Sequence, residues 1–216
     1  MENPPQVTRL PAARAADAAA ALARAFERDP AWLWALPDDR RRARVLPWFF
    51  GAALRYALRH GTVYATANAP LGAAIVLPPE RPRLQDGDVA RAGLWQMPFR
   101  AGPRGFRRFV VQGRVLEERH DCDVPPRHAY VWLLGVDPPA HGRGLGSAVL
   151  RAVTAGADAQ GVPTYLDTTN ERNLPFYRRH GFEPVHAGTF PGGACPFWTL
   201  VRAPGPSAPA PRSETA

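Results

Sequence analysis

The chain of 216 residues contains no lysine, so its 27 basic side chains are all arginines. It has only two cysteines, Cys122 and Cys195, which are too few for a disulfide framework. No apolar run is long enough to span a membrane. The N-terminus also lacks the charged segment followed by an apolar one that marks a signal peptide. These absences predict a cytoplasmic protein that makes no contact with a membrane.

Hydrophobic residues make up 45% of the chain, which is enough for a large core. Length and composition predict one domain over residues 1–203, followed by a disordered Pro/Ala-rich tail over residues 204–216. The net charge of +8 suits a polyanionic ligand. No helix-turn-helix, zinc-finger or RNP pattern accompanies it, so we do not expect nucleic acid. Residues His120 to Asp123 match no zinc spacing, so we expect a polar loop there and no bound metal.

Hydrophobic periodicity predicts a mixture of helices and strands. An alanine-rich helix over residues 12–27 ends at Asp29 and Pro30, and Trp32 and Trp34 are expected in the loop that follows. Pro47 is expected to kink or restart the second helix. Strands are predicted at 7–10, 61–68, 72–77, 130–136, 162–168, 182–190 and 197–202. The other helices are predicted at 88–97, 103–119, 145–160 and 173–180.

A glycine-rich segment connects an apolar strand to an amphipathic helix. The strand, residues 130–136, ends at Asp137 and two prolines, because proline has no N–H for a sheet. Glycines alternate through the loop, and the helix then places Leu145, Val149 and Ala152 on one face. Free backbone N–H groups and the positive end of the helix dipole make such a loop an anion site.

The residues of this loop separate three kinds of phosphate-binding site. A P-loop requires a lysine, which the chain lacks. A dinucleotide fingerprint counted from Gly142 would need a glycine where Ser147 stands. The segment from His141 to Gly146 resembles the acyl-CoA pyrophosphate loop of the GNAT acetyltransferases, Arg/Gln-x-x-Gly-x-Gly/Ala, with His141 in the Arg/Gln place. An ordinary glycine-rich turn is the alternative.

A second stretch, Tyr165 to Phe182, resembles the other GNAT signature, in which a strand and a polar loop precede a short helix with Asn and Tyr. Its segment Asn173-Leu174-Pro175-Phe176-Tyr177 is similar to the puromycin N-acetyltransferases, as is Gly144-Leu145-Gly146-Ser147-Ala148-Val149. Phe26 with Asp29-Pro30 is a weaker similarity. The close resemblance covers about residues 130–183.

The resemblance implies the GNAT fold, an α/β (α+β) class with a mixed twisted sheet, helices on both faces and a strand split at the acyl-CoA site. It implies acetyl-CoA as the donor and Tyr177 as the proton donor to the departing thiolate. It places the thioester carbonyl near the backbone N–H of Val136. The residues that it assigns to acetyl-CoA are Leu134, Val136, His141, Gly142, Arg143, Gly144, Leu145, Gly146, Ser147, Asn173 and Tyr177. Asn173 could instead cap the following helix.

The general base is not determined by the sequence. Many GNAT enzymes carry a glutamate six positions before the Val136 position, but here that residue is Tyr130, a poor base at neutral pH. His128 precedes it on the same expected strand face, and Asp167 stands on the neighbouring strand. We rank these two equally, and a water chain to the solvent is the alternative.

The acceptor is predicted to be a small-molecule amine with an aromatic part. Trp32, Trp34, Tyr130 and Trp132 are expected to form aromatic walls around it. The resemblance to puromycin acetyltransferases adds antibiotic-like and aminonucleoside-like acceptors, and hence antibiotic resistance. A catalytically silent GNAT domain that binds CoA as a sensor or interaction module is the alternative function. The chain is expected to be a monomer or a homodimer.

Overall fold

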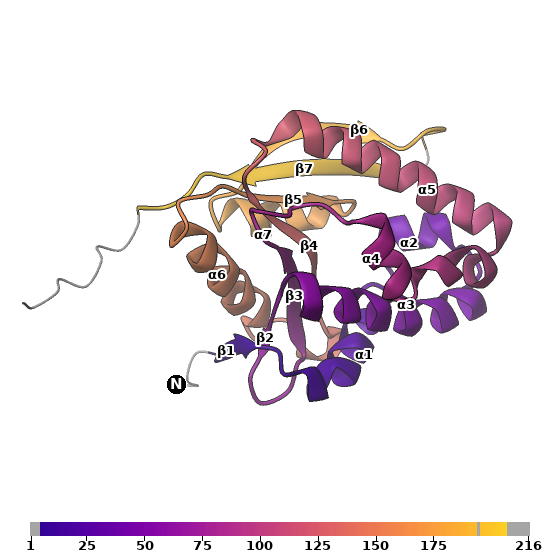
Figure 1. Cartoon of the computed structure of the whole chain (residues 1–216), viewed down its shortest axis with the longest axis horizontal. Helices are drawn as coiled ribbons and strands as arrows, with labels where there is room; N and C mark the ends of the chain where they lie inside the picture. The colour runs from indigo at the N-terminus through magenta and orange to yellow at the C-terminus, as the bar shows by residue number, and fades with distance from the viewer. Residues whose placement is uncertain (1–4, 194, 207–216) are drawn as a thin grey trace, which may run out of the picture.

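The computed structural model describes residues 5–193 and 195–206, and its strands form a mixed sheet in the order β1-β2-β3-β4-β5-β7-β6 (Figure 1). This arrangement has the layout that the sequence predicts. The strands are β1 (Val7–Arg9), β2 (Thr62–Thr66), β3 (Gly72–Leu77), β4 (Ala129–Val136), β5 (Thr164–Thr168), β6 (Glu183–Thr189) and β7 (Pro196–Arg202). The α-helices are α1 (Ala15–Ala25), α2 (Pro30–Ala35), α3 (Asp39–His60), α4 (Asp86–Arg91), α5 (Met97–Asp123), α6 (Leu145–Asp158) and α7 (Leu174–Arg178). Short 3-10 turns are η1 (Ala12–Arg14), η2 (Leu94–Gln96), η3 (Pro138–Ala140) and η4 (Glu171–Asn173).

Helices cover both faces of the sheet, because strand β3 is apolar on both sides. Ala73 and Ile75 pack with α1 and α3, whereas Ala74 and Val76 pack with α6. Side chains alternate along a strand, so these two pairs point to opposite faces. Figure 1 shows α6 and α3 on opposite sides of β3. The core is therefore divided into two layers by the sheet.

The sheet opens between its central strands, β4 and β5. The two strands pair in parallel only over residues 129–131 and 164–166, although β4 is eight residues long. On its other side, β4 pairs with β3 with a register shift between Ile75 and Val76. The shift leaves Trp132 as the extra residue of a bulge, a feature that bends a strand. The second half of β4 therefore has no strand partner on the β5 side.

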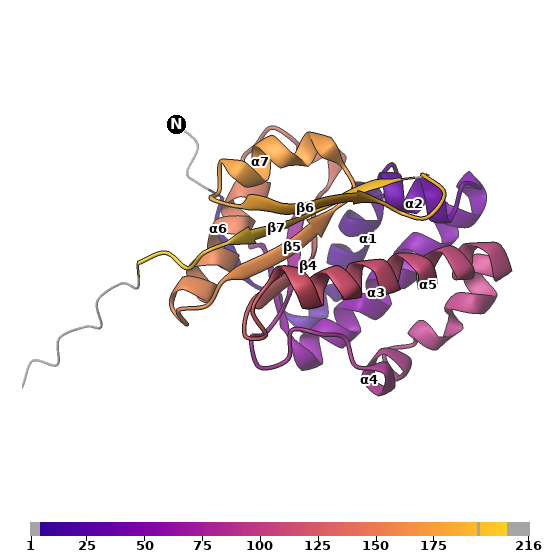
Figure 2. The same ribbon diagram turned by 90° about the horizontal axis from the view of Figure 1, so that it is seen from above.

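Helix α5 lies beside this opening and contacts α2 and α3 as well as β6 and β7. Figure 2 shows it running alongside the two C-terminal strands. The helix begins at Met97, earlier than predicted, and bends at Gly102, which has φ 73° and ψ 169°. The prediction of a polar loop from His120 to Asp123 is wrong, because these residues form the last turn of α5 and His120 is buried.

Two aromatic residues that were expected in a loop, Trp32 and Trp34, lie in helix α2. The Asp29 carboxylate accepts hydrogen bonds from the N–H groups of Ala31 at 3.0 Å and Trp32 at 3.4 Å. Pro30 occupies the first turn, where its missing N–H costs nothing. The Asp-Pro pair that ends one helix therefore begins the next.

Pro47 does not restart the second helix, because α3 runs without a break from Asp39 to His60. Leu46 and Phe50, on either side of the proline, are buried in the core. Their burial holds the chain in a helix across the lost hydrogen bond. The expectation that Pro47 restarts the helix is therefore wrong.

The part of the predicted tail at residues 204–206 has no regular structure, and residues 207–216 lie outside the described residues. The N–H of Gly205 donates to Oδ1 of Asp158 at 2.7 Å, so the chain just after β7 is attached to the end of α6. Within the described ranges, none of the helices is long and apolar enough to cross a membrane.

Candidate active site

The loop between β4 and α6 has the backbone shape that its glycines allow. Gly142 has φ 78° and Gly144 has φ 73°, in the left-handed region that residues with a side chain rarely adopt. Apart from the chain neighbours of each glycine, no heavy atom of the described residues lies within 4 Å of where a Cβ would stand on either residue. The loop therefore leaves open space directly over its backbone.

The same loop presents backbone donors to that space. In the described part of the chain, no acceptor takes the N–H groups of residues 142–147, and the first bond of α6 runs from Ala148 N to Gly144 O at 3.0 Å. These N–H groups stand at the N-terminus of a 14-residue helix, where the dipole is positive. The open space over the loop and these N–H donors, together called the phosphate cradle, fit a pyrophosphate group.

An ion pair holds the start of the loop against helix α1. Asp137 follows β4 and accepts hydrogen bonds from Arg24 Nε at 2.9 Å and Nη2 at 2.6 Å. The hydrogen bond from Arg24 lowers the pKa of Asp137 below its ordinary value, against the effect of burial. His141 Nε2 lies 2.9 Å from the carbonyl oxygen of Val136 and so connects the loop back to the strand end.

A cavity of about 520 Å³, here called the loop cavity, extends from this loop into the opened sheet. It carries two arginines, Arg28 and Arg179, and one carboxylate, Asp29. Of the residues predicted to bind acetyl-CoA, all but the exposed Arg143 line it: Leu134, Val136, His141, Gly142, Gly144, Leu145, Gly146, Ser147, Asn173 and Tyr177.

A second cavity of about 490 Å³, here called the aromatic cavity, lies on the other side of the opening. Trp32, Tyr130 and Trp132 line it, as the sequence predicts, together with Phe49 and Phe109. Its wall combines β4 and β5 with α2, α3 and α5.

Trp34 does not line the aromatic cavity. Its ring stacks on Phe190, with ring centroids 5.4 Å apart and an angle of 8° between the planes. The guanidinium of Arg108 donates to the Trp34 carbonyl at 2.7 Å. Trp34 therefore packs against the C-terminal hairpin, and we do not carry it forward as a substrate contact.

The aromatic cavity is acidic although the chain is strongly basic. Asp29, Asp86, Glu117 and Asp167 line it, against a single arginine, Arg83. Burial raises the pKa of Asp167 from 3.8 to about 6, and the nearby Asp29 adds to the rise. The Tyr130 hydroxyl donates to Asp167 at 2.8 Å and partly offsets it. Asp167 is thus a buried carboxylate that changes protonation state near neutral pH.

The two cavities share five residues, Phe26, Asp29, Leu134, Asn173 and Tyr177. Burial, with smaller contributions from Asp167 and Asp29, raises the pKa of the Tyr177 phenol above its ordinary value. Tyr177 is therefore a protonated hydroxyl at neutral pH, standing where the cavities meet. Asn173 does not cap α7 with its side chain, and its Nδ2 instead donates to Thr168 Oγ1 at 3.2 Å.

Asp29 is the residue at this junction that sequence reasoning missed. Besides capping α2, its carboxylate accepts from Thr169 Oγ1 at 3.2 Å, and burial raises its pKa. The Asp-Pro pair signalled only a helix boundary. The position of Asp29 beside Tyr177 depends on how α2 docks against the end of β5, which no local pattern encodes.

His128 lines neither cavity. Its side chain is fully buried, with Nδ1 2.6 Å from the Pro125 carbonyl oxygen and Nε2 2.5 Å from Nε2 of His120. His120, from the end of α5, lines the aromatic cavity instead. Of the two candidate bases, the structure therefore brings only Asp167 to the site.

We found no group of three or more histidine, cysteine or acidic side chains placed to hold a metal among residues 5–193 and 195–206.

Comparison with known proteins identifies the family. The model of the acetyltransferase (GNAT) family matches residues 31–182. The chain belongs to this family. GNAT proteins use acetyl-CoA as the acyl donor, which agrees with the cradle above the glycine loop. The predicted GNAT fold is confirmed, whereas the finer similarity to puromycin acetyltransferases stays a prediction.

Two curated GNAT relatives match only part of the chain. An uncharacterized N-acetyltransferase of Schizosaccharomyces pombe is 26% identical over 103 residues, which are 44% of this chain and 40% of the relative. A mycothiol acetyltransferase of Salinispora arenicola is 42% identical over 67 residues, which are 29% of this chain and 22% of the relative. The chain thus matches less than half the length of each.

Solved GNAT structures match nearly the whole chain. A Corynebacterium glutamicum protein described as histone acetyltransferase HPA2 and related acetyltransferase has a TM-score of 0.65 at 18% identity, covering 97% of this chain and 99% of that one. An agmatine N-acetyltransferase has a TM-score of 0.62 at 15% identity, covering 93% and 100%. At these identities the likeness concerns the fold alone.

Proposed function

We propose that this GNAT protein is an acetyl-CoA-dependent N-acetyltransferase that acts on a small amine by direct transfer in a ternary complex. The observation that carries the proposal is the pair of cavities of opposite character that meet at Tyr177 and Asp29. The loop cavity offers arginines and free N–H groups, which suit the polyanionic donor. The aromatic cavity offers carboxylates, which suit a cation.

The residues that would hold acetyl-CoA are those of the glycine loop and the open edge of β4. The N–H groups of residues 142–147 would bind the pyrophosphate. The unpaired side of β4, near Leu134 and Val136, would hydrogen-bond the pantetheine arm as an added strand does. When bound, acetyl-CoA would supply an activated acetyl thioester.

The carboxylates would prepare the amine for attack. An alkylamine enters as its ammonium ion, and Asp29 and Asp167 would hold it by charge-assisted hydrogen bonds. The amine must then lose a proton, and Asp167, with a pKa of about 6, is ionised at pH 7.5 and can accept one. The raised pKa of Tyr177 keeps its phenol protonated, so that the hydroxyl can donate a hydrogen bond to the departing sulfur.

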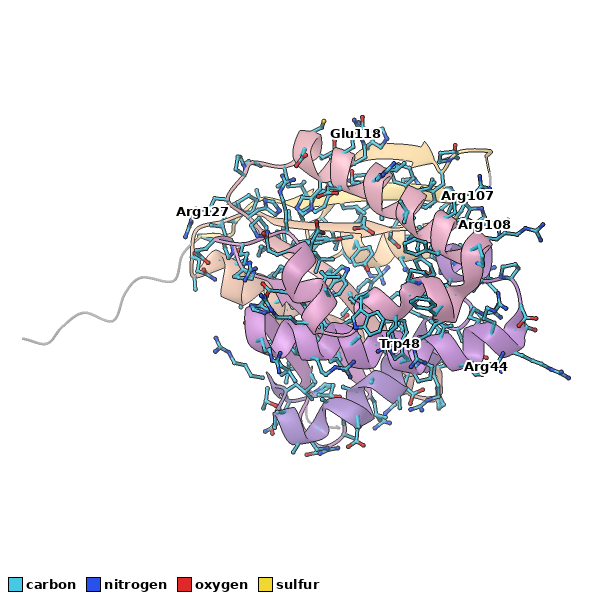
Figure 3. All side chains as sticks on the ribbon, turned by 45° about the vertical axis from the view of Figure 1, so that its right-hand side comes forward. Arg44, Trp48, Arg107, Arg108, Glu118 and Arg127 are labelled. Atoms are coloured by element: carbon cyan, nitrogen blue, oxygen red, sulfur yellow. The ribbon has the colours of Figure 1, made fainter. Side chains whose placement is uncertain are left out.

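The aromatic rings would select an amine with an apolar body. Trp32, Phe49 and Trp132 provide flat walls, which suit an aromatic or alicyclic group. Aminonucleoside-like and antibiotic-like amines remain in this class. Arg44 and Arg107 point away from the molecule in Figure 3 and do not line the cavity. They would therefore not repel a cationic acceptor from the site.

Thiol release from acetyl-CoA in the presence of an amine panel tests the proposal. The panel contains arylalkylamines, aminonucleosides, amino acids, polyamines, aminoglycosides and a histone peptide at equal concentration. We expect the highest kcat/KM on an apolar monoamine. The highest value on a peptide or an aminoglycoside would contradict the acceptor class. CoA binding with no thiol release on any amine would favour the alternative, a silent CoA-binding module.

A further inference from the structure

Helix α5 contributes to the wall of the aromatic cavity a glutamine, Gln112, that the catalytic proposal does not use. Gln112 lines the cavity, and its Oε1 atom is buried with no hydrogen-bond partner among the described residues. A buried amide oxygen without a donor costs free energy. An unpaired oxygen on a residue that lines a binding site indicates a donor on the ligand, which this side chain can meet by rotating its amide towards the cavity.

His120, two turns further along α5, offers a second acceptor. The Pro125 carbonyl can only accept, so the His128 Nδ1 atom that contacts it must carry the proton. A neutral His128 then accepts at Nε2, and the donor to it is Nε2–H of His120. This leaves a lone pair on Nδ1 of His120, the other ring nitrogen. Burial lowers the pKa of His120 to about 3, so the ring stays neutral at physiological pH.

Four other ionisable groups of the cavity wall also accept hydrogen bonds, whereas the Tyr130 and Tyr177 hydroxyls are donors. Asp29, Asp167, Asp86 and Glu117 are carboxylates. The opposing cation, Arg83, already forms an ion pair with Asp121. A carboxylate on the ligand would therefore find few donors, whereas hydroxyl and N–H groups would find several acceptors.

We infer that the acceptor carries, besides its reacting amine, a hydroxyl group on its apolar body, and that this group donates to Gln112 Oε1. The substrate class is thus a hydroxylated apolar amine rather than a plain hydrocarbon amine or an amino acid. A hydroxyl fits because it needs one acceptor and carries no charge into the aromatic wall. The inference rests on the proposed acetyltransferase function and specifies what its acceptor site distinguishes.

A matched set of amines tests the inference. Phenethylamine, its meta- and para-hydroxy derivatives and its para-methoxy derivative differ in the presence of a hydroxyl donor. With the wild-type protein, kcat/KM should be about 10-fold higher or more for one of the hydroxy amines than for phenethylamine. The methoxy derivative keeps the oxygen but has no donor, so it should lose this advantage.

The variant Gln112→Met removes the acceptor while it keeps the length of the side chain. The ratio of kcat/KM for the better hydroxy amine to that for phenethylamine should fall towards one. Arg114→Gln is the matched control, because Arg114 is exposed on the same helix and does not line the cavity. The control should keep the wild-type ratio. If Gln112→Met acted only by destabilising the fold, kcat/KM would fall for both amines and their ratio would stay at the wild-type value.

The outcomes separate the inference from the proposed function. Equal kcat/KM for hydroxy and plain amines, or an unchanged ratio in Gln112→Met, would overturn the inference and leave the acetyltransferase intact. Absence of thiol release with every amine would refute the proposed function. In that case the hydroxyl preference is measured directly, by calorimetric binding of the same amines to the CoA-saturated protein. Equal affinities for the hydroxy and plain amines would overturn the inference too.

Discussion

Replacing Asp167 by asparagine should stabilise the fold at pH 8 while it slows acetyl transfer. Burial raises the pKa of Asp167 from 3.8 to about 6. A difference of one in pKa corresponds to about 1.4 kcal/mol, so keeping this carboxylate ionised in the folded protein costs ~3 kcal/mol. Asparagine carries no charge, and its amide oxygen can still accept from the Tyr130 hydroxyl. The variant therefore avoids the cost.

The pH dependence of this effect follows from the direction of the pKa change. The folded pKa lies above the unfolded one, so stability is full below pH 3.8 and is lost as the pH rises through about 6. The gain of Asp167→Asn over wild type should therefore be small near pH 4 and reach ~2–3 kcal/mol at pH 8. Urea unfolding at both pH values measures it. A gain that is absent at pH 8, or equal at both pH values, would refute the reasoning.

The activity of the same variant provides the second half of the test. Without a carboxylate to accept the proton of the amine, kcat should fall by roughly 10²- to 10⁴-fold. Wild-type kcat should rise with pH through about 6 as Asp167 ionises. Asp17→Asn is the control, because the Asp17 side chain is 59% exposed and pairs with Arg14 at the surface. This control should change neither activity nor stability by more than ~0.5 kcal/mol.

Three other substitutions, one of them with a matched control, test the acetyl-CoA side of the site. Tyr177→Phe should lower kcat roughly 10- to 1,000-fold and leave the calorimetric Kd for CoA unchanged, because only a proton donor is lost; unaltered turnover would exclude this role. Gly144→Asp should abolish CoA binding in calorimetry, whereas Gly161→Asp should not. Both glycines have positive φ and open space around the missing Cβ, so equal effects would show that backbone strain, not the phosphate cradle, is responsible. Asp137→Asn should cost ~1 kcal/mol of unfolding free energy at pH 7 by breaking the pair with Arg24. The lowered pKa of Asp137 means that this loss should shrink as the pH falls below about 4, and a loss that does not depend on pH would contradict the ion pair.

The acetyl-CoA side of the site could be predicted from sequence, because its residues lie in two short contiguous segments. The glycines that need positive φ, the strand before them and the helix after them are contiguous in the chain, so the pattern around Gly144 contains its own geometry. Tyr177 lies in a second contiguous segment. The strand split could be expected only from the resemblance, because the bulge at Trp132 depends on how β3 pairs with β4.

The acceptor side could not be predicted in the same way, because its residues come from distant segments. Gln112 and His120 belong to a helix whose orientation is fixed only by its contacts with α2, α3 and the last strands. His128 precedes Tyr130 by two residues, but β4 begins at Ala129, and the histidine ring turns to His120 instead of the cavity. The net charge of the chain did not predict the charge of the acceptor site either, since four carboxylates and one arginine line the aromatic cavity.

The acidity of the aromatic cavity has a consequence for the direction of turnover. In the proposed reaction the amine enters as a cation and leaves as an amide, which is neutral at every physiological pH. Asp29 and Asp167 attract the first and have no net charge to attract in the second, so affinity falls at the moment of transfer. Product inhibition by the amide should therefore be weak compared with substrate binding. The product would then leave the site because it has lost the positive charge of the substrate, and release would need no movement of the fold.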